Sequence, residues 1–167
     1  NLKNPQGTQG GTGMILTVDI GNTATTMGLY TPEGTLRFRG ALKTDKNKTQ
    51  DQLAIDLLDM FHLYQADIGE VTGGVISSVV PPMTHAMAGA IRQLSGVRPM
   101  IVGPGVKTGM NILAEVHNQL GADIVASSVA ALQKYPQPII VIDMGTATTL
   151  SYLGNNTYEG CVIIPGV

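Results

Sequence analysis

Cysteine and tryptophan are scarce in this 167-residue chain, which has one cysteine, Cys161, and no tryptophan. One cysteine cannot form an intrachain disulfide or a metal site built on several thiolates, and it is typical of a reducing compartment. Charged residues are also few, at 13%, and the formal net charge is −2. The chain therefore has no general attraction for nucleic acid or an anionic membrane surface, and an anionic ligand would need local geometry and backbone donors.

Long hydrophobic runs are absent as well. No stretch reaches the ~18–20 residues that a membrane-spanning helix needs, and the N-terminus lacks the charged-then-apolar pattern of a signal peptide. We therefore expect a cytoplasmic protein that binds neither membrane nor nucleic acid. The 43% hydrophobic content and 21 glycines indicate a folded α/β protein with many tight turns. Residues 1–13, polar and glycine-rich, are interpreted as an expression leader.

The order of elements is typical of an α/β fold. Three antiparallel strands are predicted near residues 15–19, 25–30 and 35–39, with turn residues between them. A helix follows, since Thr49 and Gln52 are spaced as a capping box. Its apolar stripe comprises Leu53, Leu57, Met60, Phe61 and Tyr64. Strands at 74–80 and 99–102 then alternate with helices that begin at Pro81 and near Leu120, the latter running to Leu132.

The opening motif recurs later in the chain. Asp19-Ile20-Gly21-Asn22-Thr23 ends the first apolar strand, and Asp143-Met144-Gly145-Thr146 ends another after a proline-marked break. The two aspartates are 124 residues apart, and an internal duplication explains both copies. We therefore predict two related α/β units, one over residues 14–137 and a second that starts at 138 and is incomplete at 167.

Each copy of the motif suits a polyphosphate. A carboxylate beside a glycine-tight turn with free backbone N–H groups can face phosphates, and Asp19 can hold Mg²⁺ directly or through water. For one copy alone, a plain hairpin in which Asp19 and Asn22 cap the turn is an open alternative. Two copies favour a cleft in which the two turns hold the phosphates from both sides. The alternative is a repeated structural hairpin that binds no ligand. The duplicated device resembles actin, hexokinase, acetate kinase and heat-shock ATPases, which implies ribonuclease H-like (actin-like ATPase) domains closing over Mg-ATP.

Two further segments carry polar groups. The loop at residues 102–109 has three glycines but lacks the Gly-Lys-Ser/Thr ending of a P-loop, so a surface turn with an exposed lysine is its simplest interpretation. Asp123 falls in or just before the first turn of the helix from Leu120 to Leu132, where the helix N-terminus stabilises an ionised carboxylate. Such a carboxylate can accept a proton from a hydroxyl, but acidic residues also favour helix starts for structural reasons alone.

Five motifs, in order and spacing, resemble those of type III pantothenate kinases over residues 14–167. They are residues 19–23, 76–81, 102–109, 120–123 and 143–149. The resemblance implies a longer chain, a homodimer, and transfer of phosphate from ATP to pantothenate, the first step of coenzyme A biosynthesis. It also implies ATP along the first hairpin and at the second turn, at Asp19, Ile20, Gly21, Asn22, Thr23, Ala24, Thr25, Thr26 and Thr146.

The same resemblance implies the other roles. Pantothenate would lie near Gly121, Ala122, Asp123 and Ile124, with Asp123 as proton acceptor. A monovalent cation, K⁺ or NH₄⁺, would lie at Asp143, in addition to the metal expected at Asp19. The sequence departs from the family at one important position, because an arginine usually follows the catalytic aspartate and Ile124 cannot pair with the pantothenate carboxylate. An inactive nucleotide-binding regulator, or a kinase of another small alcohol, is therefore an alternative.

Overall fold

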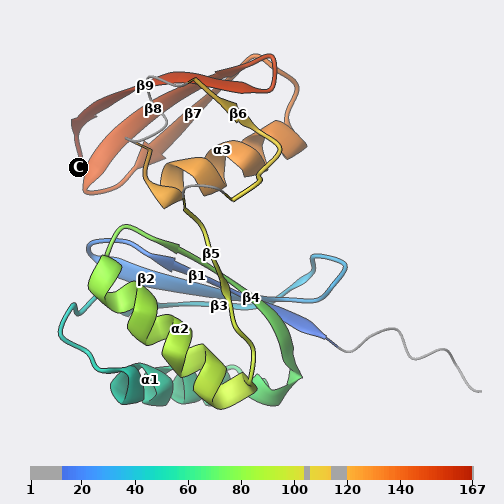
Figure 1. The fold of residues 1–167 in the computed structure, drawn as a ribbon, viewed down its shortest axis with the longest axis vertical. Coiled ribbons are helices and arrows are strands. Elements are labelled where there is room, and N and C mark those ends of the chain that lie inside the picture. The colour runs from blue at the N-terminus through green and yellow to red at the C-terminus, as the bar shows by residue number, and fades with distance from the viewer. Residues whose placement is uncertain (1–12, 104–105, 114–119, 167) are drawn as a thin grey trace, which may run out of the picture.

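Two sheets with three helices against them make up the protein in the computed structural model, which describes residues 13–103, 106–113 and 120–166 (Figure 1). The first sheet has the strand order β3-β2-β1-β4-β5, and the second has the order β6-β9-β8-β7. Helices α1 and α2 cover one face of the first sheet, while α3 lies between the two sheets. No helix in the described ranges combines the length and the apolar character that crossing a membrane requires.

The first sheet begins as an antiparallel meander and continues through two parallel crossovers. Its strands are β1 (Met14–Ile20), β2 (Ala24–Tyr30), β3 (Leu36–Lys43), β4 (Val71–Ser78) and β5 (Met100–Ile101). The crossovers contain α1 (Gln50–Leu63), a 3₁₀ turn (Ile68–Glu70) and α2 (Pro81–Ser95). The predicted opening meander and the later alternation of strands and helices are thereby confirmed.

The second sheet repeats the opening meander of the first. Its elements are β6 (Asn111–Ile112), α3 (Ala122–Lys134), β7 (Ile139–Met144), β8 (Ala147–Gly154) and β9 (Thr157–Pro165). Strands β7, β8 and β9 pair in antiparallel order as β1, β2 and β3 do. Strand β6 and helix α3 precede residue 138, yet they pack with the second sheet. The two-unit boundary at 137/138 stays a prediction.

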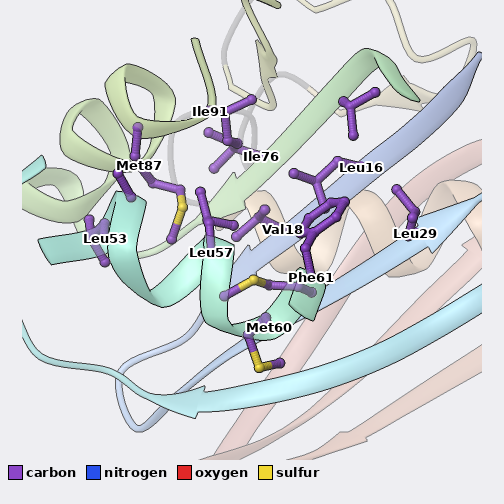
Figure 2. Close-up of a cluster of buried hydrophobic side chains, with 14 of the residues drawn as sticks. Leu16, Val18, Leu29, Leu53, Leu57, Met60, Phe61, Ile76, Met87 and Ile91 are labelled. Atoms are coloured by element: carbon purple, nitrogen blue, oxygen red, sulfur yellow. The ribbon is translucent and has the colours of Figure 1, made fainter. Parts of the chain in front are cut away.

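The main core lies between the first sheet and helices α1 and α2 (Figure 2). Strand β1 alternates strictly, with Met14, Leu16, Val18 and Ile20 buried on the helix side. Full burial of each large apolar side chain contributes about 1.5–3 kcal/mol. Because side chains alternate along a strand, this pattern fixes Asp19 on the opposite face, where α3 approaches.

Helix α1 matches its predicted stripe except at one residue. The capping box is present, since Gln52 N donates to Thr49 Oγ1 and Thr49 N donates to Gln52 Oε1. The stripe residues Leu53, Leu57, Met60 and Phe61 are buried. Tyr64 was expected in the core, but the helix ends at Leu63, and Tyr64 is 41% exposed with its ring stacked on Phe38.

The second sheet has a smaller core on one face and an apolar surface on the other. Met110, Ala131, Leu153 and Tyr158 are buried between the sheet and α3. The opposite face presents large side chains that are 43–65% exposed, namely Ile140, Ile142, Met144, Tyr152, Val162 and Ile164. No helix among the described residues covers this face. Apolar surface of this size is unusual on a monomeric protein.

Ser128 provides a test of how α3 packs. Its side chain is fully buried, and its hydroxyl has no hydrogen-bond partner in the described ranges. Ser128→Ala should raise the free energy of unfolding by about 1 kcal/mol, because an unpaired buried polar group costs about 1–3 kcal/mol. Urea unfolding measures the change. Ser127→Ala is the matched control, since Ser127 Oγ donates to Ile124 O and its loss should not stabilise the protein. Equal effects in both variants would contradict this packing.

Candidate functional site

Two tight turns, one from each sheet, face each other across a cleft. In the first, Gly21 N donates to Ala24 O at 3.0 Å, and in the second Gly145 N donates to Ala147 O at 3.1 Å. The strand registers agree, since Asp19 pairs with Thr26 and Asp143 pairs with Thr149. The first turn is longer by one residue. Residues 23 and 146 are therefore equivalent, and Asn22 is the extra residue.

The equivalent threonines meet at the centre of the cleft. The hydroxyls of Thr23 and Thr146 lie 3.2 Å apart and form a hydrogen bond, although 123 residues separate them in the chain. Both side chains are on the exposed rim of the turns, so the contact is open to solvent. The predicted arrangement, with the two motifs facing one cleft, is present.

Thr44 holds the first turn in place. Its hydroxyl donates to Gly21 O at 2.8 Å and pairs with Thr25 Oγ1 at 3.0 Å, while its backbone N–H donates to Thr23 O. The side chain is buried. Sequence reasoning missed Thr44, because a single threonine after a strand carries no signal that it will reach back to the turn at Gly21, 23 residues earlier.

Two cavities join in the cleft. The turn cavity, of about 800 Å³, lies between residues 21–24 and 145–147. The sheet cavity, of about 360 Å³, extends from it over the open face of the first sheet to Tyr30 and Arg39. Both are lined by Asp19, Thr26, Asp123 and Asp143. Three carboxylates from β1, α3 and β7 therefore gather where the cavities meet.

The environment of Asp19 favours the uncharged form of its carboxyl group. Surrounding protein atoms partly desolvate Asp19 although it opens on the cleft, and this desolvation raises its pKa above the ordinary value. The neighbouring Ser77 hydroxyl opposes the rise, and the negative charges of Asp123 and Asp143 add to it. A cation or a proton bound at this junction would relieve the repulsion.

Asp123 is in the first turn of α3, as predicted from the sequence. Its Oδ1 accepts a hydrogen bond from Ile124 N at 2.8 Å, which directs one oxygen along the helix start. Gly121 makes room for this carboxylate, because a Cβ at position 121 would overlap Asp123 Oδ1. A negative charge is favoured at a helix N-terminus.

The other expected acceptor residues divide between two places. Gly121 and Ala122 line a third cavity of about 690 Å³, the loop cavity, together with Ser78, Lys107 and other residues of the loop. Ile124 instead packs against the core of the second sheet. Its side chain lines neither the turn cavity, the sheet cavity nor the loop cavity as these are formed by the described residues. Within the 102–109 loop, residues 104 and 105 lie outside the described residues.

The carboxylate oxygens at the junction suit a cation that keeps part of its water shell better than one enclosed entirely by protein ligands. In the described ranges, no three His, Cys, Asp or Glu side chains are grouped closely enough to enclose a metal ion. Mg²⁺ commonly uses one or two carboxylates and completes its shell with water and phosphate oxygens. Asp19 and Asp143, at the junction of the cavities, suit that mode of binding.

The chain is similar in fold to several solved structures. A reductive activator for a corrinoid, iron-sulfur protein has a TM-score of 0.61 at 12% identity, covering 94% of this chain and 31% of that one. A putative 2-dehydro-3-deoxygalactonokinase from Sinorhizobium meliloti has a TM-score of 0.52 at 11% identity, covering 89% and 52%. The protein has the actin-like ATPase fold, as its duplicated turns predicted.

Sequence comparisons narrow the class to one family. The family model described as type III pantothenate kinase matches residues 15–167. The type III pantothenate kinase of Listeria innocua serovar 6a is 40% identical over 155 residues, which are 92% of this chain and 60% of the relative. That of Halalkalibacterium halodurans is 41% identical, over 92% and 61%. The chain belongs to the type III pantothenate kinase family, and it spans about 60% of the length of these curated relatives.

The raised pKa of Asp19 predicts how stability depends on pH. A carboxyl with a raised native pKa binds its proton more tightly in the folded state, so stability falls as pH rises through that pKa. Asp19→Asn removes this decrease of stability with rising pH. The variant should be at least as stable as wild type at pH 7, and the difference should shrink below pH 3.8, the ordinary pKa of the group. Urea unfolding at both pH values measures it.

Asp59→Asn, at an exposed position of α1, is the control for a general charge effect. A loss of stability at pH 7 that is confined to Asp19→Asn would show that Asp19 stabilises the fold. It would contradict the view that Asp19 serves ligand binding alone.

Proposed function

We propose that the full-length protein transfers the γ-phosphoryl group of ATP to the hydroxyl of pantothenate, giving 4′-phosphopantothenate for coenzyme A synthesis. The observation that carries the proposal is the junction of the turn cavity and the sheet cavity, where Asp123 faces the space between the two turns. Membership of the type III pantothenate kinase family supports the choice of substrates.

The turns suit the phosphates of ATP. Backbone N–H groups in tight turns form concave anion sites, and short side chains let phosphate oxygens approach them. The hydroxyls of Thr23 and Thr146 already meet between the turns, so each can donate to a phosphate that separates them. In this proposal ATP lies along the segment Asp19, Ile20, Gly21, Asn22, Thr23, Ala24, Thr25 and Thr26 and at Thr146. The side chain of Ile20 is buried in the first core and serves by anchoring the strand before the turn. Thr25 is buried and serves by positioning the turn through Thr44.

Asp19 and Asp143 would hold the cations. We assign Mg²⁺ to Asp19 and a monovalent cation, K⁺ or NH₄⁺, to Asp143, and such cations neutralise charge on the transferred group when bound. The other residues of the site need only position the reactants and stabilise charge, because phosphoryl transfer depends mainly on positioning and electrostatics.

Asp123 is assigned as the proton acceptor. Its second carboxylate oxygen is free of the helix and can accept the proton of a hydroxyl placed at the junction of the cavities. The N-terminal part of α3 (Gly121, Ala122, Asp123 and Ile124) is the segment we propose near the acceptor. Gly121 would act by leaving space for the carboxylate, and Ile124 by fixing the helix on the second core. We also propose that the protein is cytoplasmic and forms a homodimer, as the family resemblance implies.

Ile124 is the observation that favours a second candidate, a kinase of another small alcohol. The family's usual arginine at this position is replaced by a side chain packed in the second core. Initial rates with pantothenate and with a panel of uncharged primary alcohols separate the two candidates. We expect pantothenate to be preferred, and preference for an uncharged alcohol would favour the second candidate.

Asp123→Asn should abolish turnover while leaving ATP affinity within a few-fold of wild type. General-base removal costs about 10²–10⁴-fold in rate, and the substitution hardly changes side-chain volume. The measurement is kcat together with nucleotide affinity in the full-length protein, with Asp59→Asn as a surface control. Near-normal kcat would mean that Asp123 only favours the helix start, and the mechanism would lose its base.

Asp19→Asn should weaken binding of Mg-ATP and leave binding of metal-free ATP nearly unchanged. The reason is that the carboxylate acts on ATP through the cation, whereas the turn contacts the phosphates directly. Calorimetric titrations with Mg²⁺ and with EDTA provide the comparison. Equal affinities of wild type and variant for Mg-ATP would contradict the assignment of Mg²⁺ to Asp19.

A further inference from the structure

The hydrogen bonds behind the first turn run in one fixed direction. Thr44 Oγ1 donates to Gly21 O at 2.8 Å and lies 3.0 Å from Thr25 Oγ1. A hydroxyl group has only one proton to donate. Because the proton of Thr44 is directed at Gly21 O, Thr25 must donate to Thr44. Both threonine side chains are buried, so the hydrogen bonds pass from Thr25 through Thr44 to the backbone of the turn without exposure to water.

This chain of hydrogen bonds sets the orientation of the peptide between Gly21 and Asn22. The C=O and N–H groups of a trans peptide point in opposite directions. Since Gly21 O points to the buried Thr44 hydroxyl, Asn22 N–H points away from it, and Asn22 is exposed and lines the turn cavity. Asn22 N donates to no other residue in the described ranges. The Thr44 hydroxyl therefore keeps one backbone donor available to a ligand in the turn cavity.

The opposite orientation of this peptide is open to the chain and unfavourable for an anion. Rotating the peptide changes ψ of Gly21 and φ of Asn22, and glycine and asparagine are the residues that best tolerate the positive φ of the rotated turn. Asn22 has a negative φ in this structure. A rotated peptide would direct Gly21 O, instead of an N–H group, at the phosphates. The Thr44 hydroxyl is the only donor to Gly21 O among the described residues, so the observed orientation depends on it.

The second turn is held in a different way. Gly166 has the position of Thr44 there, because each follows the last paired residue of the third strand of its meander. A Cβ at Gly166 would overlap Gly145 O, the equivalent of Gly21 O. The second turn therefore rests on the backbone at Gly166, with no side chain between them. The first turn is longer by one residue, and the Thr44 side chain connects it to the end of β3.

We infer that Thr44 is a positioning residue for ATP, because its hydroxyl holds the first turn with Asn22 N–H directed at the phosphates. The inference rests on the proposed function, which places the phosphates of ATP between the two turns. Thr44 does not line the turn cavity that the described residues form, so it acts through Gly21 and not by contact with ATP.

The test compares Thr44→Val with Thr44→Ser in the full-length protein. Thr44→Val replaces the hydroxyl by a methyl group of similar size. It should weaken binding of ATP about 10-fold, seen both as KM for ATP and as the calorimetric Kd for metal-free ATP in EDTA. kcat at saturating ATP should stay near wild type. Thr44→Ser keeps the hydroxyl and should keep both affinities. Asp19→Asn, by contrast, is expected to weaken only the binding of Mg-ATP.

Two further variants separate this role from a general loss of stability. Ser95→Ala removes a hydroxyl that donates to Ile91 O and accepts from Val97 N at the C-terminal end of α2. It should lower the melting temperature without changing affinity for ATP. Thr25→Val removes the donor to Thr44 but keeps the bond from Thr44 to Gly21 O, so it should weaken ATP binding less than Thr44→Val does.

Unchanged affinity for metal-free ATP in Thr44→Val would overturn the inference, and so would a loss confined to Mg-ATP or an equal loss in Ser95→Ala or Thr25→Val. If Thr44→Val does not fold, normal affinity in Thr44→Ser with a reduced affinity in Thr25→Val supports the inference, and any other result overturns it. Wild type that binds ATP but does not phosphorylate pantothenate would contradict the proposed function alone, because the inference is measured by ATP affinity. Wild type that does not bind ATP would contradict both.

Discussion

The two tight turns face each other where Thr23 and Thr146 meet, and this arrangement places every candidate catalytic group on one cleft. Each turn is held by its own sheet, through Thr44 in the first and the β7–β8 pairing in the second. Because the strand before each turn has an aspartate as its penultimate residue, turns that face each other also bring the two carboxylates to one junction. Asp123 completes the set from the helix between the sheets.

Holding Asp19 partly out of water opposes folding at neutral pH, and this desolvation, with a smaller contribution from the charges of Asp123 and Asp143, raises the pKa of Asp19. This cost is offset by the core of the first sheet, in which the alternating apolar side chains of β1 pack against α1 and α2. The same alternation fixes which side chains meet the ligand: even-numbered residues of β1 enter the core, and Thr17 and Asp19 face the cavity. Stability and site geometry are thus set by one periodic pattern.

Local signals in the sequence predicted most of the first sheet and the duplicated turns. The capping box at Thr49 and the prolines at the start of α2 act on residues close in the chain, so pattern alone identifies them. Long-range pairing was not predictable in this way. The attachment of β6 to β9, the role of Thr44 and the presence of Arg39 in a cavity all depend on which distant strands become neighbours. Tyr64 was misplaced because the helix ended one residue earlier than its apolar stripe.

The most direct measurement is a crystal structure of the full-length protein with Mg²⁺ and a non-hydrolysable ATP analogue. The account predicts that the phosphates lie between residues 21–24 and 145–147, in contact with both Thr23 and Thr146, and that the γ-phosphate faces Asp123. A nucleotide held by one turn alone, or bound away from the junction of the three carboxylates, would contradict it.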